Sequence, residues 1–294
     1  MSGSELRLLS YAKVNLTLDV LGRRPEDGYH YIRSIMVPVS LADEVYLHPD
    51  KGVTVTSQPA IPCPPEENLA YRAALALREA SGVNAGARIH IEKRIPVAGG
   101  LAGGSSNAAA VLRGLNRLWG LDLTEEQLGR IGGRLGSDVP FCLFQRPALV
   151  EGIGERIRPI ETSRSLWAVV AYPPVAKSTG NVYRLLDELH EFPRPDTDRM
   201  LRALASGDVE EVAASLGNVF EAVMLPRHPV IRELKERMLA KGAVGALMSG
   251  AGPSVLGLVH DRESGEEIAR DLAQRTAATL AFVVQLYLTG EGRR

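Results

Sequence analysis

A glycine-rich segment constrains the fold of this chain more than any other part of the sequence. It follows an alternating apolar run and precedes an alanine-rich one, and it consists of Pro96, Val97, Ala98, Gly99, Gly100, Leu101, Ala102, Gly103, Gly104, Ser105 and Ser106. Glycine permits a positive φ and lets a ligand approach backbone N–H groups closely. A glycine-rich turn that opens a helix points unpaired amides and the positive end of the dipole at one place, which suits an anion such as a triphosphate. Glycine content alone leaves open a plain surface loop or a tight strand-to-helix turn.

The residues after the segment favour the phosphate site over the plain loop. We expect Ser105, Ser106 and Asn107 to cap a helix over Asn107–Leu118, which is rich in alanine and leucine. Ala102 is an exception within the segment, because a β-carbon disfavours a positive φ. We therefore expect the amide of Ala102 not to face phosphate.

The common nucleotide loops are absent. The sequence has neither the Gly-Lys-[Ser/Thr] ending of a Walker loop nor a Gly-x-Gly-x-x-Gly fingerprint here, and it lacks the motif set of protein kinases. The segment instead follows the pattern Pro-x-x-x-Gly-Leu-[Gly/Ala]-Gly-Gly-Ser-Ser.

Composition excludes several classes of protein. The chain has 294 residues, enough for two domains, and a formal net charge of −1 without a long run of like charges. Nucleic acid and anionic membranes are therefore disfavoured as partners. The two cysteines, Cys63 and Cys142, have no metal or disulfide spacing, which fits a reducing cytosol. We find no signal or transit peptide and no apolar stretch of about 20 residues, and we expect a cytoplasmic, bacterial-type protein that is a monomer or weak dimer.

The first half of the sequence predicts strands followed by helices. Extended runs are expected at Leu6–Leu9, Val14–Leu21 and Ser34–Val45, with Pro38 indicating an edge or a bulge. A helix is expected over Asn68–Ala80, and the alternation in Ala87–Glu92 is typical of a half-buried strand. The capping box Thr124–Gln127 opens another helix, which should stop at Gly136.

The second half predicts a ferredoxin-like domain. Its elements alternate as strand, helix, strand, strand, helix and strand, at Leu166–Tyr172, His228–Ala240, Val244–Met248, Ser254–Val259, Gly265–Ala273 and Ala281–Leu288. In the first of these helices we expect Ile231, Leu234, Met238 and Leu239 to share the buried face. About fifty mostly helical residues are inserted after the first strand. We place the domains at residues 1–157 and 158–294, which makes an α+β protein.

Three motifs in order resemble those of the GHMP kinases, the family of galactokinase, homoserine kinase and mevalonate kinase. They are Ser10–Leu16, the glycine-rich segment and Met248–Ser254, and the resemblance extends from about Leu6 to Leu288. It implies a two-domain GHMP kinase architecture with an N-terminal ribosomal-protein-S5-like domain and a C-terminal ferredoxin-like domain. It also implies phosphorylation of a small alcohol by ATP with Mg²⁺, with Pro96–Ser106 and Lys93 at the nucleotide.

The resemblance assigns two catalytic positions. Asp138 matches the acid that accepts the proton of the attacking hydroxyl or orients that hydroxyl, and Lys13 matches its basic partner, which offsets the developing charge. From the residues alone, Asp138 beside Pro140 is rather a helix cap, and Lys13 a lysine at a strand edge whose ammonium reaches water. Phosphoryl transfer needs the proton removed only late, so an ordinary carboxylate suffices.

The resemblance also implies an acceptor that contains cytidine diphosphate. Tyr29 and Tyr183 then flank the cytosine ring, and His30 binds its polar edge. Asn15 and Thr179 are further substrate contacts. Without the resemblance, Asp27–His30 is a hairpin turn with a packed tyrosine.

Metal binding and the alternative functions rest on fewer residues. Ser106 is the one candidate ligand for magnesium, and the remaining histidines form no ligand spacing. Other alcohols, of the mevalonate or homoserine type, remain possible acceptors. A non-catalytic nucleotide- or RNA-binding module is a further alternative, disfavoured by the net charge and by the pair Lys13 and Asp138.

Overall fold

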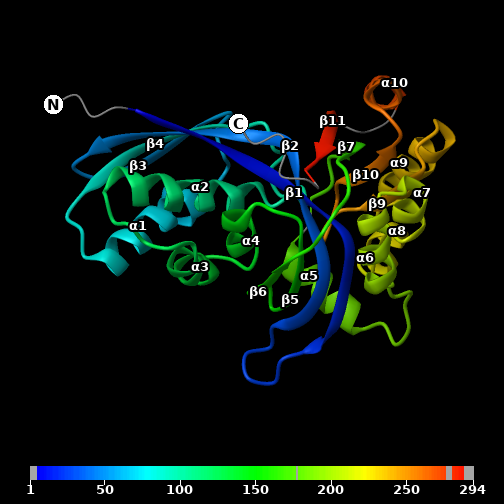
Figure 1. Cartoon of the computed structure of the whole chain (residues 1–294), viewed down its shortest axis with the longest axis horizontal. Coiled ribbons are helices and arrows are strands. Elements are labelled where there is room, and N and C mark those ends of the chain that lie inside the picture. Colours follow the sequence, from blue (N-terminus) through cyan, green and yellow to red (C-terminus); the bar gives the residue numbers. More distant parts are fainter. Residues whose placement is uncertain (1–4, 177, 276–279, 288–294) are drawn as a thin grey trace. The chain divides into compact units, whose positions relative to one another are not determined.

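The computed structural model describes residues 5–176, 178–275 and 280–287. Its chain divides into two compact units (Figure 1). Unit 1 contains residues 1–12, 41–97 and 102–145, and unit 2 contains residues 13–40, 98–101 and 146–294. The glycine-rich segment thus contributes to both units. The predicted boundary between residues 157 and 158 stays a prediction.

Unit 1 combines helices with the ends of two long strands. Strand β1 (Leu6–Arg23) begins in it, and strand β2 (His30–Asp50) ends in it. Its other elements are β3 (Val53–Gln58), the short 3₁₀ turn Pro65–Glu67, α1 (Leu69–Ser81), β4 (Gly86–Glu92), α2 (Gly103–Leu118), α3 (Glu125–Gly133) and α4 (Val139–Phe144). Strand β4 lies between β3, to which it runs parallel, and the end of β2, to which it runs antiparallel. Helices α1 and α2 lie on one side of β3 and β4 (Figure 1).

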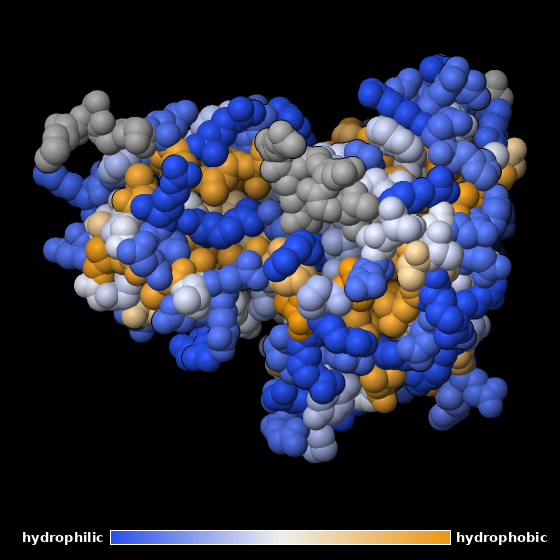
Figure 2. Space-filling view, in the orientation of Figure 1, coloured by the Kyte–Doolittle hydropathy of each residue, from blue (hydrophilic) through white to orange (hydrophobic). Residues whose placement is uncertain are grey.

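Unit 2 confirms the ferredoxin-like domain. Strands β7 (Leu166–Tyr172), β9 (Gly245–Met248), β10 (Val255–Val259) and β11 (Leu280–Leu286) lie in the order β11-β7-β10-β9, all antiparallel to their neighbours. This 4-1-3-2 order is the one that a split βαβ sequence produces. The two helices of the motif are α9 (Pro229–Ala240) and α10 (Arg262–Arg275), and hydrophilic side chains cover the outer surface of α10 (Figure 2). The last residue of the predicted final strand, Leu288, lies outside the described residues.

The expected insertion in unit 2 is also present and mostly helical. It comprises α5 (Thr179–Asp187), α6 (Thr197–Ser206), α7 (Val209–Ala214), the two-residue strand β8 (Gly217–Asn218) and α8 (Glu221–Arg227). A hairpin of β5 (Ala148–Gly152) and β6 (Arg156–Pro159) precedes β7. No helix in the described part of the chain has the length and apolar character needed to cross a membrane.

Several local predictions are confirmed. Helix α1 begins after Asn68, whose side chain accepts from the Ala70 amide, and Thr124 and Gln127 form the expected capping box. In β4 the apolar side chains of Ala87, Ile89 and Ile91 are fully buried, while the alternating residues Arg88, His90 and Glu92 are not buried. Both cysteines are free.

Other local predictions are wrong in instructive ways. The first two extended runs form one strand, β1, because Ser10 and Lys13, which interrupt the apolar pattern, are themselves buried. Pro38 lies within β2, and its interpretation as an edge or a bulge stays a prediction. It lies where β2 changes partner, between its pairing with β5, which ends at Met36, and its pairing with β11 at Val39. A residue without an N–H donor fits such a change.

Two helix predictions need the same kind of correction. Leu239 is 47% exposed and does not share the buried face of Ile231, Leu234 and Met238. Helix α3 ends at Gly133, before the predicted stop at Gly136, and its C-cap Arg134 has φ −75°, a conformation that does not require glycine.

Candidate functional site

The glycine-rich segment leads into helix α2 by a route that differs from the prediction. The helix starts at Gly103, so Ser105, Ser106 and Asn107 lie inside its first turns and do not cap it. Its N-cap is Ala102, with φ +57° and no side-chain capping bond. The expectation that Ala102 avoids a positive φ is therefore wrong, and Ala98 also has φ +56°. Left-handed backbone at two alanines costs energy that the surroundings must offset.

A buried carboxylate holds both flanks of the segment in unit 1. Asp43, with no exposed surface, accepts hydrogen bonds at Oδ1 from the amides of Arg94 (2.7 Å) and Ile95 (2.8 Å). Its Oδ2 accepts from Asn107 Nδ2 (2.8 Å) on α2 and from the ammonium of Lys93. The four donors satisfy the carboxylate, which a buried charge requires.

The hydrogen-bond chain continues from Asn107 to strand β1. Asn107 Nδ2 also donates to Ser10 Oγ (2.9 Å), Ser10 Oγ donates to Ser106 Oγ (2.9 Å), and Ser106 Oγ donates to the Tyr11 carbonyl (2.7 Å). The hydroxyl of Ser106 is thus engaged on both sides and almost fully buried. Lys93 Nζ lies beside Asn107 Oδ1 (3.2 Å) and 3.3 Å from where a β-carbon on Gly103 would stand.

The middle of the segment is held within unit 2 by the third motif. The Gly99 carbonyl accepts from the Ser254 amide (3.2 Å), and the Gly100 carbonyl accepts from Ser249 Oγ (3.3 Å). A β-carbon on Gly100 would overlap the Ser249 carbonyl, so glycine is required there. Ser254 Oγ is buried and has no hydrogen-bond partner among the described residues, which is uncommon for a buried hydroxyl.

Lys13 and Asn15 lie buried in β1, also in unit 2. Lys13 is 4% exposed, which excludes the alternative of an edge lysine reaching water. Its Nζ donates to Asn15 Oδ1 (2.8 Å), and Asn15 Nδ2 donates to Ser34 Oγ (2.8 Å) on β2. The Lys13 amide donates to the Leu101 carbonyl (3.1 Å), which joins the first motif to the glycine-rich segment.

Asp138 lies in unit 1 immediately before α4. Its backbone is at the N-cap position, yet its side chain makes no capping hydrogen bond. The plain capping role is therefore not what its carboxylate does. This leaves the predicted catalytic role in place as a prediction.

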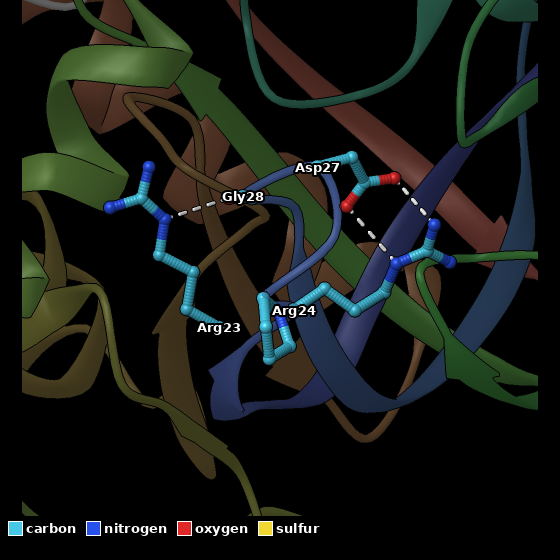
Figure 3. Close-up of a pocket in the computed structure, with 5 residues that line it drawn as sticks. Arg23, Arg24, Asp27 and Gly28 are labelled. Carbon is cyan, nitrogen blue, oxygen red and sulfur yellow. Dashed lines mark hydrogen bonds and ion pairs between the residues drawn. The ribbon is translucent and has the colours of Figure 1, made fainter.

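Hydrogen bonds brace the turn between β1 and β2, which presents Tyr29. Arg24 donates to both oxygens of Asp27 (Figure 3), and Asp27 Oδ1 also accepts from the Tyr29 amide (3.1 Å). Arg24 and Asp27 are among the residues that line a hollow of about 360 Å³. Desolvation pushes the pKa of Asp27 upward, but the bonds from Tyr29 and Arg24 outweigh it and lower the pKa below its usual value. Arg23 points the other way and donates to the Gly28 carbonyl (3.1 Å). The ring of Tyr29 is 56% exposed, as a stacking surface must be.

The aromatic residues predicted to bind substrate meet in unit 2. The rings of His30 and Tyr183 lie 4.7 Å apart at a tilt of 30°, and Tyr183 rests edge-on against Phe220 at 4.7 Å. His30 Nε2 lies 2.8 Å from Asp187 Oδ1. Thr179 is exposed at the start of α5. The sequence analysis named both His30 and Tyr183 as substrate contacts, and their contact with a base stays a prediction.

No group of three or more His, Cys, Asp or Glu side chains that could hold a metal is found among residues 5–176, 178–275 and 280–287. Ser106, the predicted magnesium ligand, already has two partners for its hydroxyl. The described residues therefore do not form a protein cage for magnesium.

Sequence reasoning missed the residues that support the site. Asp43, Asp187 and Asn218 were not singled out, and Ser10 was named only as the first residue of a motif. Only Asp43 gave a signal, as a carboxylate inside an apolar strand next to Glu44. The others are single polar residues whose partners are distant in sequence.

Family models identify the class of protein. The model described as the GHMP kinases N terminal domain matches residues 68–146, and the GHMP kinases C terminal model matches residues 200–278. Together with relatives of well over 30% identity, these matches show that the chain belongs to the GHMP kinase family. Kinases of this family act on small molecules and use ATP as the phosphate donor.

Two relatives share the name 4-diphosphocytidyl-2-C-methyl-D-erythritol kinase. One from Symbiobacterium thermophilum is 62% identical over 87% of this chain and 91% of its own, and one from Brevibacillus brevis is 44% identical over 96% of each. A crystal structure titled 4-(cytidine 5'-diphospho)-2C-methyl-D-erythritol kinase matches with a TM-score of 0.81 and 37% identity, over 96% of this chain and 99% of that one. A homoserine kinase from Cytophaga hutchinsonii shares the fold at 20% identity and a TM-score of 0.74, over 96% of this chain and 94% of its own.

Proposed function

We propose that the chain transfers the γ-phosphate of ATP to the 2-hydroxyl of 4-diphosphocytidyl-2-C-methyl-D-erythritol. This reaction belongs to non-mevalonate (MEP pathway) synthesis of isoprenoid precursors. The observation that carries the proposal is the close relation to kinases with this substrate in their name, over nearly the whole chain. The homoserine kinase and a mevalonate kinase from L. major that share the fold are 20% and 19% identical to this chain, and such identities do not support their acceptors for it.

The residues of the glycine-rich segment are proposed to bind the phosphates of ATP. Backbone amides in left-handed and helix-opening conformations present donors to an anion. The positive φ of Ala98, Gly100 and Ala102 and the start of α2 at Gly103 give this segment that character. Lys93 adds positive charge near the start of α2, although Asp43 neutralises much of it.

Lys13 and Asp138 are proposed to act on the reacting groups. The carboxylate of Asp138 orients the acceptor hydroxyl and accepts its proton late in the transfer, and the ammonium of Lys13 offsets negative charge that develops on the transferred group. Asn15 fixes the Lys13 ammonium through its Oδ1. Magnesium would bind together with the triphosphate, since the described residues do not enclose a metal.

Tyr29, His30, Tyr183 and Thr179 are proposed to hold the acceptor. The exposed Tyr29 on its hydrogen-bonded turn offers one stacking face, and Tyr183, braced by Phe220, offers another. Stacking on an aromatic ring contributes about 1–3 kcal/mol per base. The cytoplasmic location and the monomer or weak dimer stay predictions.

A panel of acceptors tests the proposal. Steady-state phosphorylation of the cytidine diphosphate alcohol, mevalonate and homoserine with ATP should give the highest kcat/KM for the first. A higher value for either of the other two would overturn the assignment. Replacing Asp138 in the variant Asp138→Asn should lower kcat by at least about a hundredfold, the usual scale of acid–base contributions, with ATP binding retained; unchanged turnover would remove Asp138 from the mechanism.

A further inference from the structure

A short segment in unit 2, residues 217–221, makes contacts that the proposed function does not use. It contains strand β8 and the start of α8. It pairs in parallel with β1, with Thr17 opposite Gly217 and Leu18 opposite Asn218, and the Val219 amide donates to the Leu18 carbonyl (3.0 Å). The segment is therefore fixed to the strand that carries Lys13 and Asn15.

Asn218 uses every hydrogen-bonding group of its side chain on backbone atoms. Its Nδ2 donates to the carbonyls of Met248 and Gly250, both at 2.7 Å, and its Oδ1 accepts from the Phe220 amide (3.0 Å). The residue is 7% exposed. An amide has two donors and two acceptor sites, so few other side chains could satisfy these three partners at once.

The two N–H groups of Asn218, called its donor arm below, bind carbonyls of the turn that contacts the glycine-rich segment. Met248 and Gly250 belong to the third motif, and Glu221 holds the Met248 amide as well (2.8 Å). The next residue, Ser249, donates to the Gly100 carbonyl, and the Ser254 amide donates to Gly99. A β-carbon on Gly250 would lie 2.9 Å from the Gly100 carbonyl oxygen, so the turn and the segment are in close contact.

The side-chain oxygen of Asn218, its other arm, is connected to the residues proposed to bind the acceptor. Asn218 Oδ1 fixes the amide of Phe220, whose ring supports Tyr183, and Tyr183 in turn packs against His30. Phe220 is 1% exposed, so its ring has no freedom to follow a shifted backbone.

We propose that Asn218 is a positioning residue that sets the backbone behind the donor segment with its two N–H groups and the aromatic support of the acceptor with its oxygen. This inference rests on the proposed function, because it takes Gly99 and Gly100 as phosphate contacts and Tyr183 as an acceptor contact. Asn218 acts through these residues and touches neither ligand itself.

The isosteric variant Asn218→Asp separates the two arms. It keeps an oxygen for the Phe220 amide but places a second oxygen against two carbonyls, so only the donor arm loses its bonds. We expect the dissociation constant for ATP to rise by about tenfold or more, since unsatisfied buried groups are costly, while that for CDP changes by less than about twofold.

Asn116→Asp is the matched control. Asn116 donates to the Leu123 carbonyl and accepts from its amide, both at 3.0 Å, near the end of α2 opposite to the glycine-rich segment. The same chemical change there should leave both dissociation constants within about twofold of the wild type. Phe220→Leu tests the other arm and should weaken CDP while leaving ATP unchanged.

Calorimetric titration of the full chain with ATP and with CDP decides the matter without requiring turnover. If Asn218→Asp does not fold, Ser249→Ala, which removes the bond to Gly100, should give a smaller loss of ATP affinity alone. Equal effects of the Asn218 or Ser249 change on ATP and CDP, or no effect on either, would overturn the positioning role while leaving the proposed function standing. A wild-type chain that binds no ATP would overturn both.

Discussion

The flanks of the glycine-rich segment and its middle are held by two different kinds of chemistry. In unit 1 the flanks are bound to a buried charge, Asp43, which takes four donors including the ammonium of Lys93. In unit 2 the middle is bound by neutral groups, namely Ser249 Oγ and the amides of Ser254 and Lys13. A buried charge fixes geometry strongly but is costly when one partner is lost, whereas a neutral hydrogen bond contributes less and fails more gently.

The largest effect should come from breaking the charged support. In Asp43→Asn the new amide group faces Lys93 Nζ and Asn107 Nδ2, both donors, and leaves the lysine without its counter-charge. Breaking a buried pair by removing one partner costs about 3–5 kcal/mol, and we expect a loss of that size in the free energy of unfolding measured with urea.

Two further variants make this result specific. Asp43→Asn combined with Lys93→Met should recover much of the stability, because the uncompensated charge is gone. Asp50→Asn on the same strand, where Asp50 is exposed, should change stability by less than about 0.5 kcal/mol. Equal losses in the Asp43 and Asp50 variants would show that the flanks do not depend on charge.

A smaller effect should follow from disturbing the neutral support. Gly100 has φ +79°, and in Gly100→Ala the added β-carbon would overlap the Ser249 carbonyl and lie 2.8 Å from that of Gly252. Both neighbours are backbone atoms and cannot turn aside. We expect a loss of stability on the order of 1–3 kcal/mol together with weaker ATP binding, measured by urea unfolding and calorimetry.

Gly129→Ala serves as the control for that variant. Gly129 lies inside helix α3, and a β-carbon there meets nothing within 4 Å. Alanine favours a helix interior over glycine, so this variant should be neutral or slightly more stable. A Gly100 variant that behaves like it would contradict the close contact with the third motif.

The smallest effect concerns a charged pair that is not part of the site. The hydrogen bond from Arg237 lowers the pKa of Asp271 to about 2, with Lys241 assisting. Because the folded-state pKa lies below the unfolded value, the pair stabilises the protein above about pH 4 and loses this contribution as the pH falls toward 2. Thermal unfolding of the wild type and of Asp271→Asn should therefore differ slightly at pH 7 and converge near pH 2; a difference that persists at pH 2 would exclude the ion pair as its cause.

Sequence reasoning succeeded where a pattern is local and failed where a residue answers to distant partners. The alternation in Ala87–Glu92 and the capping box at Thr124 each state their structure within a few residues, and both were correct. Ala102 was misjudged because tertiary contacts impose a conformation that its own propensity opposes. Leu239 was misplaced because helical spacing does not reveal where the edge of a buried face lies.

The candidate site shows the same division. Its motif residues could be named from the sequence, because each belongs to a contiguous pattern. Asn218 could not, because its partners Met248 and Gly250 follow it by some thirty residues, and its strand is only two residues long. The residues that hold the site in position have partners distant in sequence, whereas the motif residues belong to contiguous patterns.

The hydrogen bonds of Asp43 to residues before and after the glycine-rich segment have a topological consequence. One carboxylate joins the amide of Ile95 to the side chain of Asn107, so the chain between them is closed into a ring without any covalent cross-link. The entropy of closing that ring is lost once, during folding, and is not lost again when a ligand enters. The segment can therefore change conformation only while its two ends stay fixed. Its amides should exchange hydrogen with solvent much faster than those of Arg94 and Ile95.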